Sequence, residues 1–181
     1  MRTLIAIAAL LLVLPTMTAP AAASSELEPL GFLLGKWVSP STGQPGEPTG
    51  MAEFSRGLQD RVMLRNNYAD YPATAGRPGV RHEDLMVIYA LPSGGLRADY
   101  YDSEGHAIRY AVQVPEPSHA IFLSEPATGE PRFRLSYRLQ PTGVLEGAFE
   151  IAPAGEPEAF KPYLAWESRK TKDRAPSEVG P

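Results

Sequence analysis

Residues 132–150 read RFRLSYRLQPTGVLEGAFE, and this stretch decides the fold. Apolar and polar side chains alternate on both sides of a Pro-Thr-Gly turn, which is typical of an antiparallel β-hairpin with one buried face. With Gly143 in the left-handed bulge position, apolar residues pair across the two strands on one face. The polar pairs on the other face are Arg138 with Glu146 and Arg134 with Glu150. A shift of one residue would destroy both patterns, so the stretch predicts an amphipathic antiparallel sheet with a fixed register.

The rest of the chain repeats this pattern in short alternating runs that are separated by turn residues. Such runs are typical of an all-β sandwich or barrel. Ten strands are expected, at about residues 36–38, 50–56, 61–69, 83–91, 96–102, 106–114, 119–124, 131–139, 143–151 and 158–170. No useful stretch with helical periodicity interrupts them. The predicted fold is therefore all-β, an antiparallel up-and-down β-barrel of about ten strands.

The connections between the expected strands indicate which end of the barrel is open. In an up-and-down barrel, alternate connections lie at opposite ends. The long connections, about 39–49, 70–82 and 152–157, share one end, and turns of about three to four residues share the other. A short apolar segment at 26–34, limited by Pro29 to a turn or two of helix, enters at the short-turn end. We expect this helical turn to plug that end, while the long loops surround an opening.

The first 23 residues have the features of a secretory signal peptide. Arg2 precedes an apolar run from Leu4 to Leu14, and the small residues up to Ala23 offer a cleavage site. The apolar run is too short to span a bilayer. We expect cleavage after Ala23, a single barrel domain over residues 24–170, and a flexible C-terminal tail over 171–181.

The composition narrows the possible chemistry. The chain has no Cys, which excludes disulfides, a thiol nucleophile, Cys-ligated zinc and the lipid attachment site of bacterial lipoproteins. A formal net charge of −4 argues against nucleic acid or an anionic membrane as a partner. We therefore expect a periplasmic or secreted protein that does not insert into a membrane after signal cleavage. The sequence leaves the oligomeric state open.

The first and last strands carry a recognisable combination. Gly35-Lys36-Trp37 follows the short helical turn, and Arg169 or Lys170 places a cation on the last strand. This combination resembles the calycin (lipocalin-like) pattern, in which a basic side chain from the final strand covers a Trp at the closed end. With ten strands over residues 26–170, the chain is most similar to nitrobindin-like and fatty-acid-binding-protein-like barrels. The stretch 33–37 also resembles bacterial exported lipocalin-like proteins of unestablished function.

The resemblance implies a lumen that binds a small molecule. Nitrobindin-like proteins bind haem through a His in the C-terminal part of the chain, whereas here no His follows His119. We therefore expect no haem and no other cofactor.

Extending the hairpin registers around the ring assigns the inward-facing side chains. The inner face is expected to carry Val62, Leu64, Asn66, Tyr68, Leu85, Val87, Tyr89 and Leu91, with Met86 and Ile88 outside. The ligand-binding candidates in the lumen are Asn66, Tyr68, Glu83, Tyr89, Tyr100, His106, Tyr110 and Tyr137. Apolar walls with a few polar groups are how small-molecule pockets are built. The alternative, in which the tyrosine hydroxyls satisfy one another or water inside a filled core, stays open.

The sequence contains no catalytic motif that would indicate a particular reaction. The chain has neither Gly-x-Ser-x-Gly nor His-Glu-x-x-His, so no catalytic residue and no metal ligand is assigned. His106 is expected to pair with Asp102 across the turn at 103–105. The main hypothesis is an exported carrier of a small, largely apolar molecule. The alternatives are an isomerase- or cyclase-type barrel enzyme that uses His106 with Asp102 or Glu83, a haem- or metal-binding barrel, and a plain interaction protein.

Overall fold

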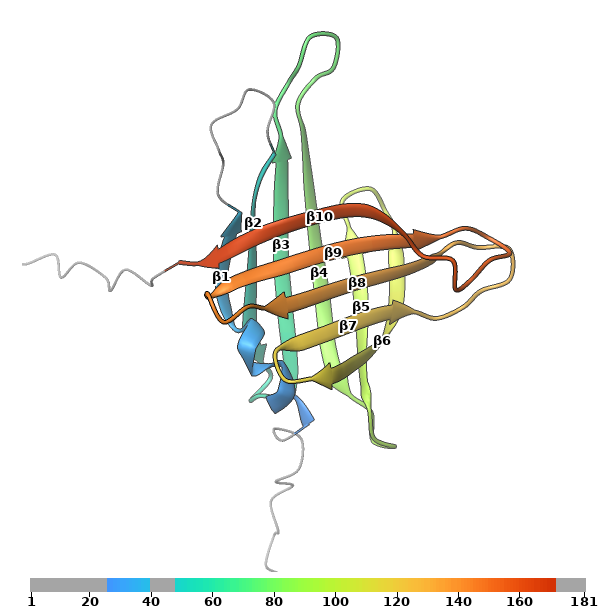
Figure 1. The fold of residues 1–181 in the computed structure, drawn as a ribbon. Helices are drawn as coiled ribbons and strands as arrows, with labels where there is room; N and C mark the ends of the chain where they lie inside the picture. The colour runs from blue at the N-terminus through green and yellow to red at the C-terminus, as the bar shows by residue number, and fades with distance from the viewer. Residues whose placement is uncertain (1–25, 40–47, 172–181) are drawn as a thin grey trace, which may run out of the picture.

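The chain folds into one closed antiparallel barrel of ten strands (Figure 1), and the structure, a computed structural model, describes residues 26–39 and 48–171. The strands are β1 (Gly35–Ser39), β2 (Thr49–Gly57), β3 (Val62–Tyr71), β4 (Val80–Ala90), β5 (Leu96–Asp102), β6 (Ala107–Glu116), β7 (His119–Ser124), β8 (Arg132–Leu139), β9 (Val144–Ala152) and β10 (Lys161–Lys170). Each strand pairs with its neighbours in chain order, and β1 pairs with β10 to close the ring. The predicted up-and-down barrel is confirmed. The expected signal peptide and nearly all of the expected tail lie outside the described residues.

The hairpin of β8 and β9 has the predicted register. Arg134 lies opposite Glu150, and Arg138 lies opposite Glu146. Arg134 makes the expected ion pair, with Nε and Nη2 donating to the two carboxylate oxygens of Glu150 at 2.6 and 2.8 Å. The Arg138 guanidinium instead donates to Glu116 on β6. The alternation of side chains therefore predicted the register correctly. It did not predict the partner of Arg138, which lies on β6.

One end of the barrel is closed by a short 3-10 helix, η1 (Glu28–Leu33), as predicted. Leu30 and Leu33 of η1 are fully buried. The indole Nε1 of Trp37 donates a hydrogen bond to the Leu33 carbonyl at 2.6 Å. The ammonium of Lys170 lies 5.6 Å from the centroid of the Trp37 ring, within the range of a cation–π contact. The cation expected near this Trp is thus supplied by Lys170.

Aromatic rings fill the half of the lumen next to η1. The Tyr137 ring makes edge-to-face contacts with Phe54, Phe122 and Trp166 at centroid distances of 5.5, 6.1 and 6.0 Å. Gly147 lies opposite both Tyr137 and Trp166 in register. A Cβ atom at Gly147 would lie only 2.2 Å from the Trp166 ring. The absence of a side chain at this position is what lets the indole lie flat against β9.

The inner faces of β3 and β4 differ from the prediction by one residue. Met86 and Ile88, expected outside, are fully buried, whereas Leu85 is 39% exposed. The cause is the turn between β4 and β5, where two consecutive glycines adopt positive φ and Ala90 pairs with Leu96. This turn is one residue longer than the one assumed from the sequence, and a one-residue shift moves every side chain of a strand to the other face.

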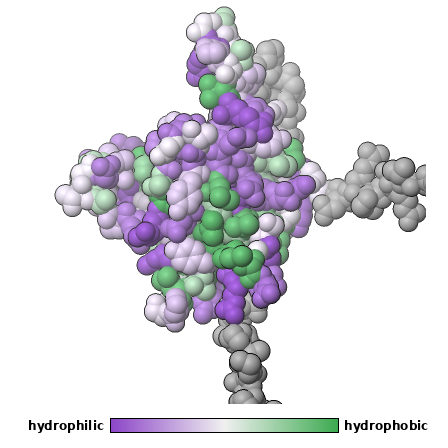
Figure 2. Space-filling model, turned by 180° about the vertical axis from the view of Figure 1, so that it is seen from behind, coloured by the Kyte–Doolittle hydropathy of each residue, from purple (hydrophilic) through white to green (hydrophobic). Residues whose placement is uncertain are grey.

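The same difference of one residue applies to β3, because β3 and β4 pair along their whole length. Val62, Leu64, Asn66 and Tyr68 therefore face outward together with Leu85, Val87 and Tyr89. Figure 2 shows apolar side chains gathered in the middle of the face opposite β7–β10. These outward residues, which the sequence placed in the lumen, thus form part of the outer surface.

No helix within residues 26–39 and 48–171 has the length and apolar character needed to cross a bilayer.

Candidate functional site

The structure divides the eight predicted ligand-binding residues into three groups. Tyr100, Tyr110 and Tyr137 face the lumen as predicted, and Tyr110 and Tyr137 are 1% exposed. Their rings belong to one chain of edge-to-face contacts in which Phe122 joins Tyr110 to Tyr137. Of the predicted candidates, the three tyrosines on β5, β6 and β8 therefore line the lumen, and those on β3 and β4 do not.

Four candidates lie on the outer face because of the shifted register of β3 and β4. Asn66 is exposed, and Tyr68 lies under the guanidinium of Arg81 at 4.1 Å. Glu83 accepts a hydrogen bond from the same Arg81 at 2.9 Å. The remaining candidate, Tyr89, donates its hydroxyl to Asp99 at 3.2 Å on the outer face of β5. The prediction that these four line the lumen is wrong.

His106 lies at the rim of the open end. Its Nδ1 is 2.8 Å from Oδ2 of Asp102, which is the pairing predicted from the turn, and its side chain is 68% exposed. The prediction that it faces inward with the tyrosines is wrong, because the residue lies in the turn itself. Glu83, the alternative partner considered for His106, points to the outer face and pairs with Arg81.

A buried ion pair lies at the centre of the lumen, and sequence reasoning missed it. Nη1 of Arg65 on β3 donates to Oδ1 of Asp84 on β4 at 2.8 Å. The two side chains are only 6% and 2% exposed. Asn67 donates to the other oxygen of Asp84 at 2.7 Å. Because the register of β3 and β4 differs from the predicted one by one residue, Arg65, Asn67 and Asp84 face the lumen in place of Asn66 and Glu83.

The polar network continues from Asp84 toward the open end. Nε2 of His82 lies 3.2 Å from Oδ2 of Asp84 and 3.4 Å from the hydroxyl of Tyr100. The Tyr100 hydroxyl donates to Oδ2 of Asp102 at 3.2 Å. On the other side of the imidazole, Nδ1 of His82 lies 2.8 Å from Oε2 of Glu104. One hydrogen-bonded chain therefore connects the core with the rim.

Burial determines the electrostatics of this network. Burial lowers the pKa of Arg65, but the fields of Tyr137 and Asp84 outweigh it, so that the pKa stays above its ordinary value and the guanidinium remains charged. Burial raises the pKa of Tyr137 to about 12. Burial likewise holds the pKa values of Tyr100 and Tyr110 well above their usual range. All three tyrosines are therefore neutral hydrogen-bond donors at neutral pH.

Three buried side-chain donors have no hydrogen-bond partner in the described part of the chain. One is Nη1 of Arg56 at the closed end, where the other terminal nitrogen donates to the Leu27 carbonyl, and the other two are Nε of Arg65 and the hydroxyl of Tyr137. The Arg65 guanidinium carbon lies 5.8 Å from the centroid of the Tyr137 ring, so both groups belong to the same region. An unpaired buried donor costs about 1–3 kcal/mol, and native proteins contain few of them. These two groups mark the place where the lumen offers hydrogen bonds that the protein itself does not use.

On the inner face of β8–β10, apolar side chains become more accessible toward the open end. Leu164 on β10 is 43% exposed, although it lies opposite the inward-facing Phe149. Phe149 itself stacks on Phe133 at a centroid distance of 5.8 Å, and both are only partly buried. This side of the lumen therefore changes from packed rings near η1 to accessible apolar side chains near the opening, opposite the polar network on β4 and β5.

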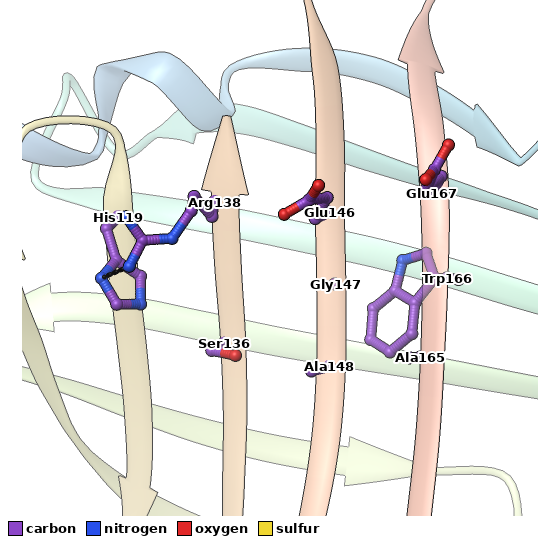
Figure 3. Close-up of a pocket in the computed structure, with 9 residues that line it drawn as sticks. All are labelled: His119, Ser136, Arg138, Glu146, Gly147, Ala148, Ala165, Trp166 and Glu167. Atoms are coloured by element: carbon purple, nitrogen blue, oxygen red, sulfur yellow. Dashed lines mark hydrogen bonds between the residues drawn. The ribbon is translucent and has the colours of Figure 1, made fainter. Parts of the chain in front are cut away.

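A separate hollow of about 600 Å³ lies on the outer face of β7–β10 (Figure 3). Three small outward residues, Ser136, Ala148 and Ala165, are adjacent in register and lie in its lining. The adjacent row of outward side chains consists of His119, Arg138, Glu146 and Glu167. A second hollow of about 470 Å³ lies beside the β3–β4 connection, where its lining includes Tyr71 and Arg81. Neither hollow contains a residue of the internal polar network.

Comparison of the chain with models of protein families and with curated proteins gave no match. The assignment of the site therefore depends on its geometry and chemistry.

A signal for the internal ion pair is present in the sequence. Both alternations of β4 are apolar enough to face a core, Leu85 and Val87 on one and Met86 and Ile88 on the other. The second alternation places Asp84 inside, and the pairing of β3 with β4 then places Arg65 inside as well. Two opposite charges on the same face of adjacent strands indicate a buried pair, provided that the turn between β4 and β5 has the right length.

Proposed function

We propose that the barrel binds a small, largely apolar molecule in its lumen and hydrogen-bonds the polar group of that molecule through Arg65 and Tyr137. The observation that carries this proposal is that Nε of Arg65 and the hydroxyl of Tyr137 are buried without partners, while the Arg65 guanidinium lies over the Tyr137 ring. The more accessible side chains of Phe149 and Leu164 supply apolar contacts toward the opening. Such a mixture of apolar walls and a few oriented polar groups is characteristic of small-molecule sites.

The charges in the lumen indicate which kind of polar group the ligand carries. The positive charge of Arg65 is already matched by Asp84 at 2.8 Å. A buried anionic ligand would leave one negative charge without a partner, which is costly in a region of low dielectric. The two free groups, Nε–H and O–H, are both donors. A neutral acceptor such as a carbonyl oxygen therefore suits the site better than a carboxylate.

The closed end supports a calycin-type relationship. A short helix precedes β1, Trp37 packs on that helix, and Lys170 from the last strand covers the Trp ring. We propose on this basis that the chain is a lipocalin-like barrel. From the signal-like features of residues 1–23 we propose further that it is exported and acts in the periplasm or outside the cell. Small apolar molecules are poorly soluble in those compartments, and a carrier would keep them dispersed.

The test is a binding titration with a neutral ketone as the probe. An alkyl naphthyl ketone, whose emission shifts to the blue in apolar surroundings, is titrated with the protein and then displaced by 2-undecanone or by decanoate. We expect saturable binding and more effective displacement by the ketone. Tyr137→Phe should weaken ketone binding about fivefold, the equivalent of one net hydrogen bond of about 1 kcal/mol.

Tyr101→Phe is the matched control, because Tyr101 lies on the outer face of β5 and is 50% exposed. It should leave binding unchanged. Since the Tyr137 hydroxyl is buried without a partner, Tyr137→Phe should not destabilise the protein and should raise its free energy of unfolding by about 1–3 kcal/mol. A wild-type protein that does not bind the ketone, or a Tyr137→Phe variant that binds as well as wild type, would refute the proposal.

A further inference from the structure

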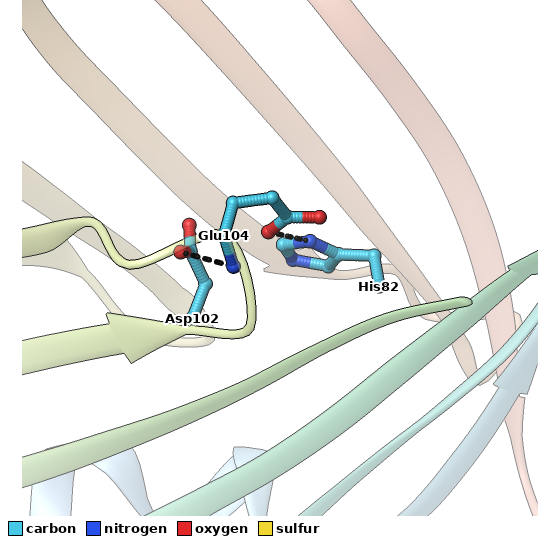
Figure 4. A group of neighbouring side chains, drawn as sticks. All are labelled: His82, Asp102 and Glu104. Carbon is cyan, nitrogen blue, oxygen red and sulfur yellow. Dashed lines mark hydrogen bonds and ion pairs between the residues drawn. The ribbon is translucent and has the colours of Figure 1, made fainter. Parts of the chain in front are cut away.

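We propose that His82, Asp102 and Glu104 at the rim of the open end form a binding site for a divalent transition-metal ion of the Zn²⁺ type. One ligand atom from each of the three side chains lies within 4.8 Å of the other two. Figure 4 shows the side chains of Asp102 at the end of β5, of Glu104 in the β5–β6 turn, and of His82 on β4. The site is separate from the ketone site proposed around Arg65 and Tyr137, and it does not depend on that proposal.

The surroundings of His82 indicate a cation. Nδ1 faces a carboxylate oxygen of Glu104 at 2.8 Å, and Nε2 faces a carboxylate oxygen of Asp84 at 3.2 Å. A neutral imidazole carries only one N–H, so that one of its nitrogens would present a lone pair to an ionised oxygen. A metal ion bound between Nδ1 and the Glu104 oxygen would make this contact favourable.

The charges of the network favour a divalent ion. The hydrogen-bonded network contains three carboxylates, Asp84, Asp102 and Glu104, and its one guanidinium is that of Arg65. Asp84 and Asp102 are also largely shielded from water, with side chains that are 2% and 6% exposed. Asp84 is paired with Arg65, and Asp102 is in contact with the imidazole of His106 at 2.8 Å. One divalent cation bound between His82 and the rim carboxylates would offset the negative charge of Asp102 and Glu104.

The ligands are oriented by their neighbours in the way that metal sites require. Asp84 binds Nε2 of His82, which leaves Nδ1 as the coordinating atom, and Asp84 is itself held by Arg65 and Asn67. A carboxylate behind a ligating His is the usual outer-shell arrangement. Glu104, which is 42% exposed, supplies the adjustable ligand.

The donor set selects the class of metal. One imidazole nitrogen and two carboxylates suit Zn²⁺ and related first-row ions, whereas Mg²⁺ and Ca²⁺ prefer oxygen ligands alone. Three protein ligands leave the fourth tetrahedral position of Zn²⁺ to water or to another ligand. Because the ligands come from β4, from the end of β5 and from the β5–β6 turn, a bound ion would also link this turn to β4.

The proposal is tested by isothermal titration calorimetry with Zn²⁺ on chelator-treated protein that carries no polyhistidine tag. We expect one equivalent of Zn²⁺ to bind and Mg²⁺ not to bind. His82→Gln and Glu104→Gln should each weaken Zn²⁺ binding at least tenfold. Glu104 lies in an exposed turn, so its variant tests the site without disturbing the core. His119→Gln is the control, because His119 has a Glu neighbour as well, Glu116 on β6, but lies outside the cluster.

Replacement of Zn²⁺ by Co²⁺ gives a second readout, a visible absorption band that should be lost in His82→Gln and kept in His119→Gln. If wild type fails to bind Zn²⁺, the proposal is wrong. It is equally wrong if His82→Gln and Glu104→Gln bind Zn²⁺ as tightly as wild type, or if His119→Gln accounts for the loss.

Discussion

The buried ion pair between Arg65 and Asp84 makes the most demanding prediction about stability. The two side chains are 6% and 2% exposed, and Nη1 lies 2.8 Å from Oδ1. Removing one member leaves the other charge buried without its partner, which costs about 3–5 kcal/mol. We therefore expect Arg65→Met and Asp84→Leu each to lower the free energy of unfolding by about 3 kcal/mol. That is a large fraction of the total stability of a typical domain, about 5–15 kcal/mol.

The double variant should be much less damaged than the sum of the single changes. Replacing both charges by apolar groups removes the desolvation penalty together with the attraction, and such replacements are often neutral or stabilising. Some loss remains, because Asn67 and His82 also give up their contacts with Asp84. We expect the double variant to lose no more than about 3 kcal/mol, which corresponds to a coupling energy of about 3 kcal/mol between the two sites.

Urea unfolding followed by tryptophan fluorescence measures these differences, because Trp37 and Trp166 are both packed in the barrel. Arg134→Met with Glu150→Leu is the matched control. It removes an ion pair of the same kind from the outer face, where the side chains are 35% and 20% exposed. The coupling there should be below about 1 kcal/mol. If the effects of Arg65→Met and Asp84→Leu simply add, the argument that burial makes each charge depend on the other is refuted.

Two further predictions concern the rim and the core. Burial alone would raise the pKa of Asp102, but the hydrogen bonds from the amide and ring of His106 lower it, so the stabilisation from this carboxylate is complete above about pH 4 and is lost as the pH falls through its native pKa. Asp102→Asn should therefore destabilise the protein by about 1–2 kcal/mol at pH 7 and by less at lower pH, measured by urea unfolding across pH; a deficit that does not depend on pH would contradict this reasoning. Gly147→Ala should cost about 1–3 kcal/mol and shift the tryptophan emission, because the new methyl group would overlap the Trp166 ring. Gly31→Ala, with no atom within 4 Å of the added methyl group, is its control; equal effects of the two changes would show that the close approach at Gly147 does not matter.

The sequence determined the features that depend on neighbouring residues and turns. The alternation and turn of residues 132–150 led to the register of β8 and β9, and the turn at 103–105 led to the pairing of His106 with Asp102. The number of strands, the closed end and the inward direction of Tyr100 and Tyr137 followed from the same rules. Each of these features depends on a local hydrogen-bonding pattern or on an alternation with one apolar face.

The tertiary structure alone decided which faces of β3 and β4 point inward. Both alternations of β4 are apolar, so its sequence carried no preference, and the length of the turn before β5 settled the choice. As a result, the lumen contains Arg65, Asp84 and His82 instead of the predicted residues, which are Asn66, Tyr68, Glu83 and Tyr89. The physical reason is that the side chains of a strand alternate with a period of two residues, so one extra residue in a turn replaces the entire set that faces the core.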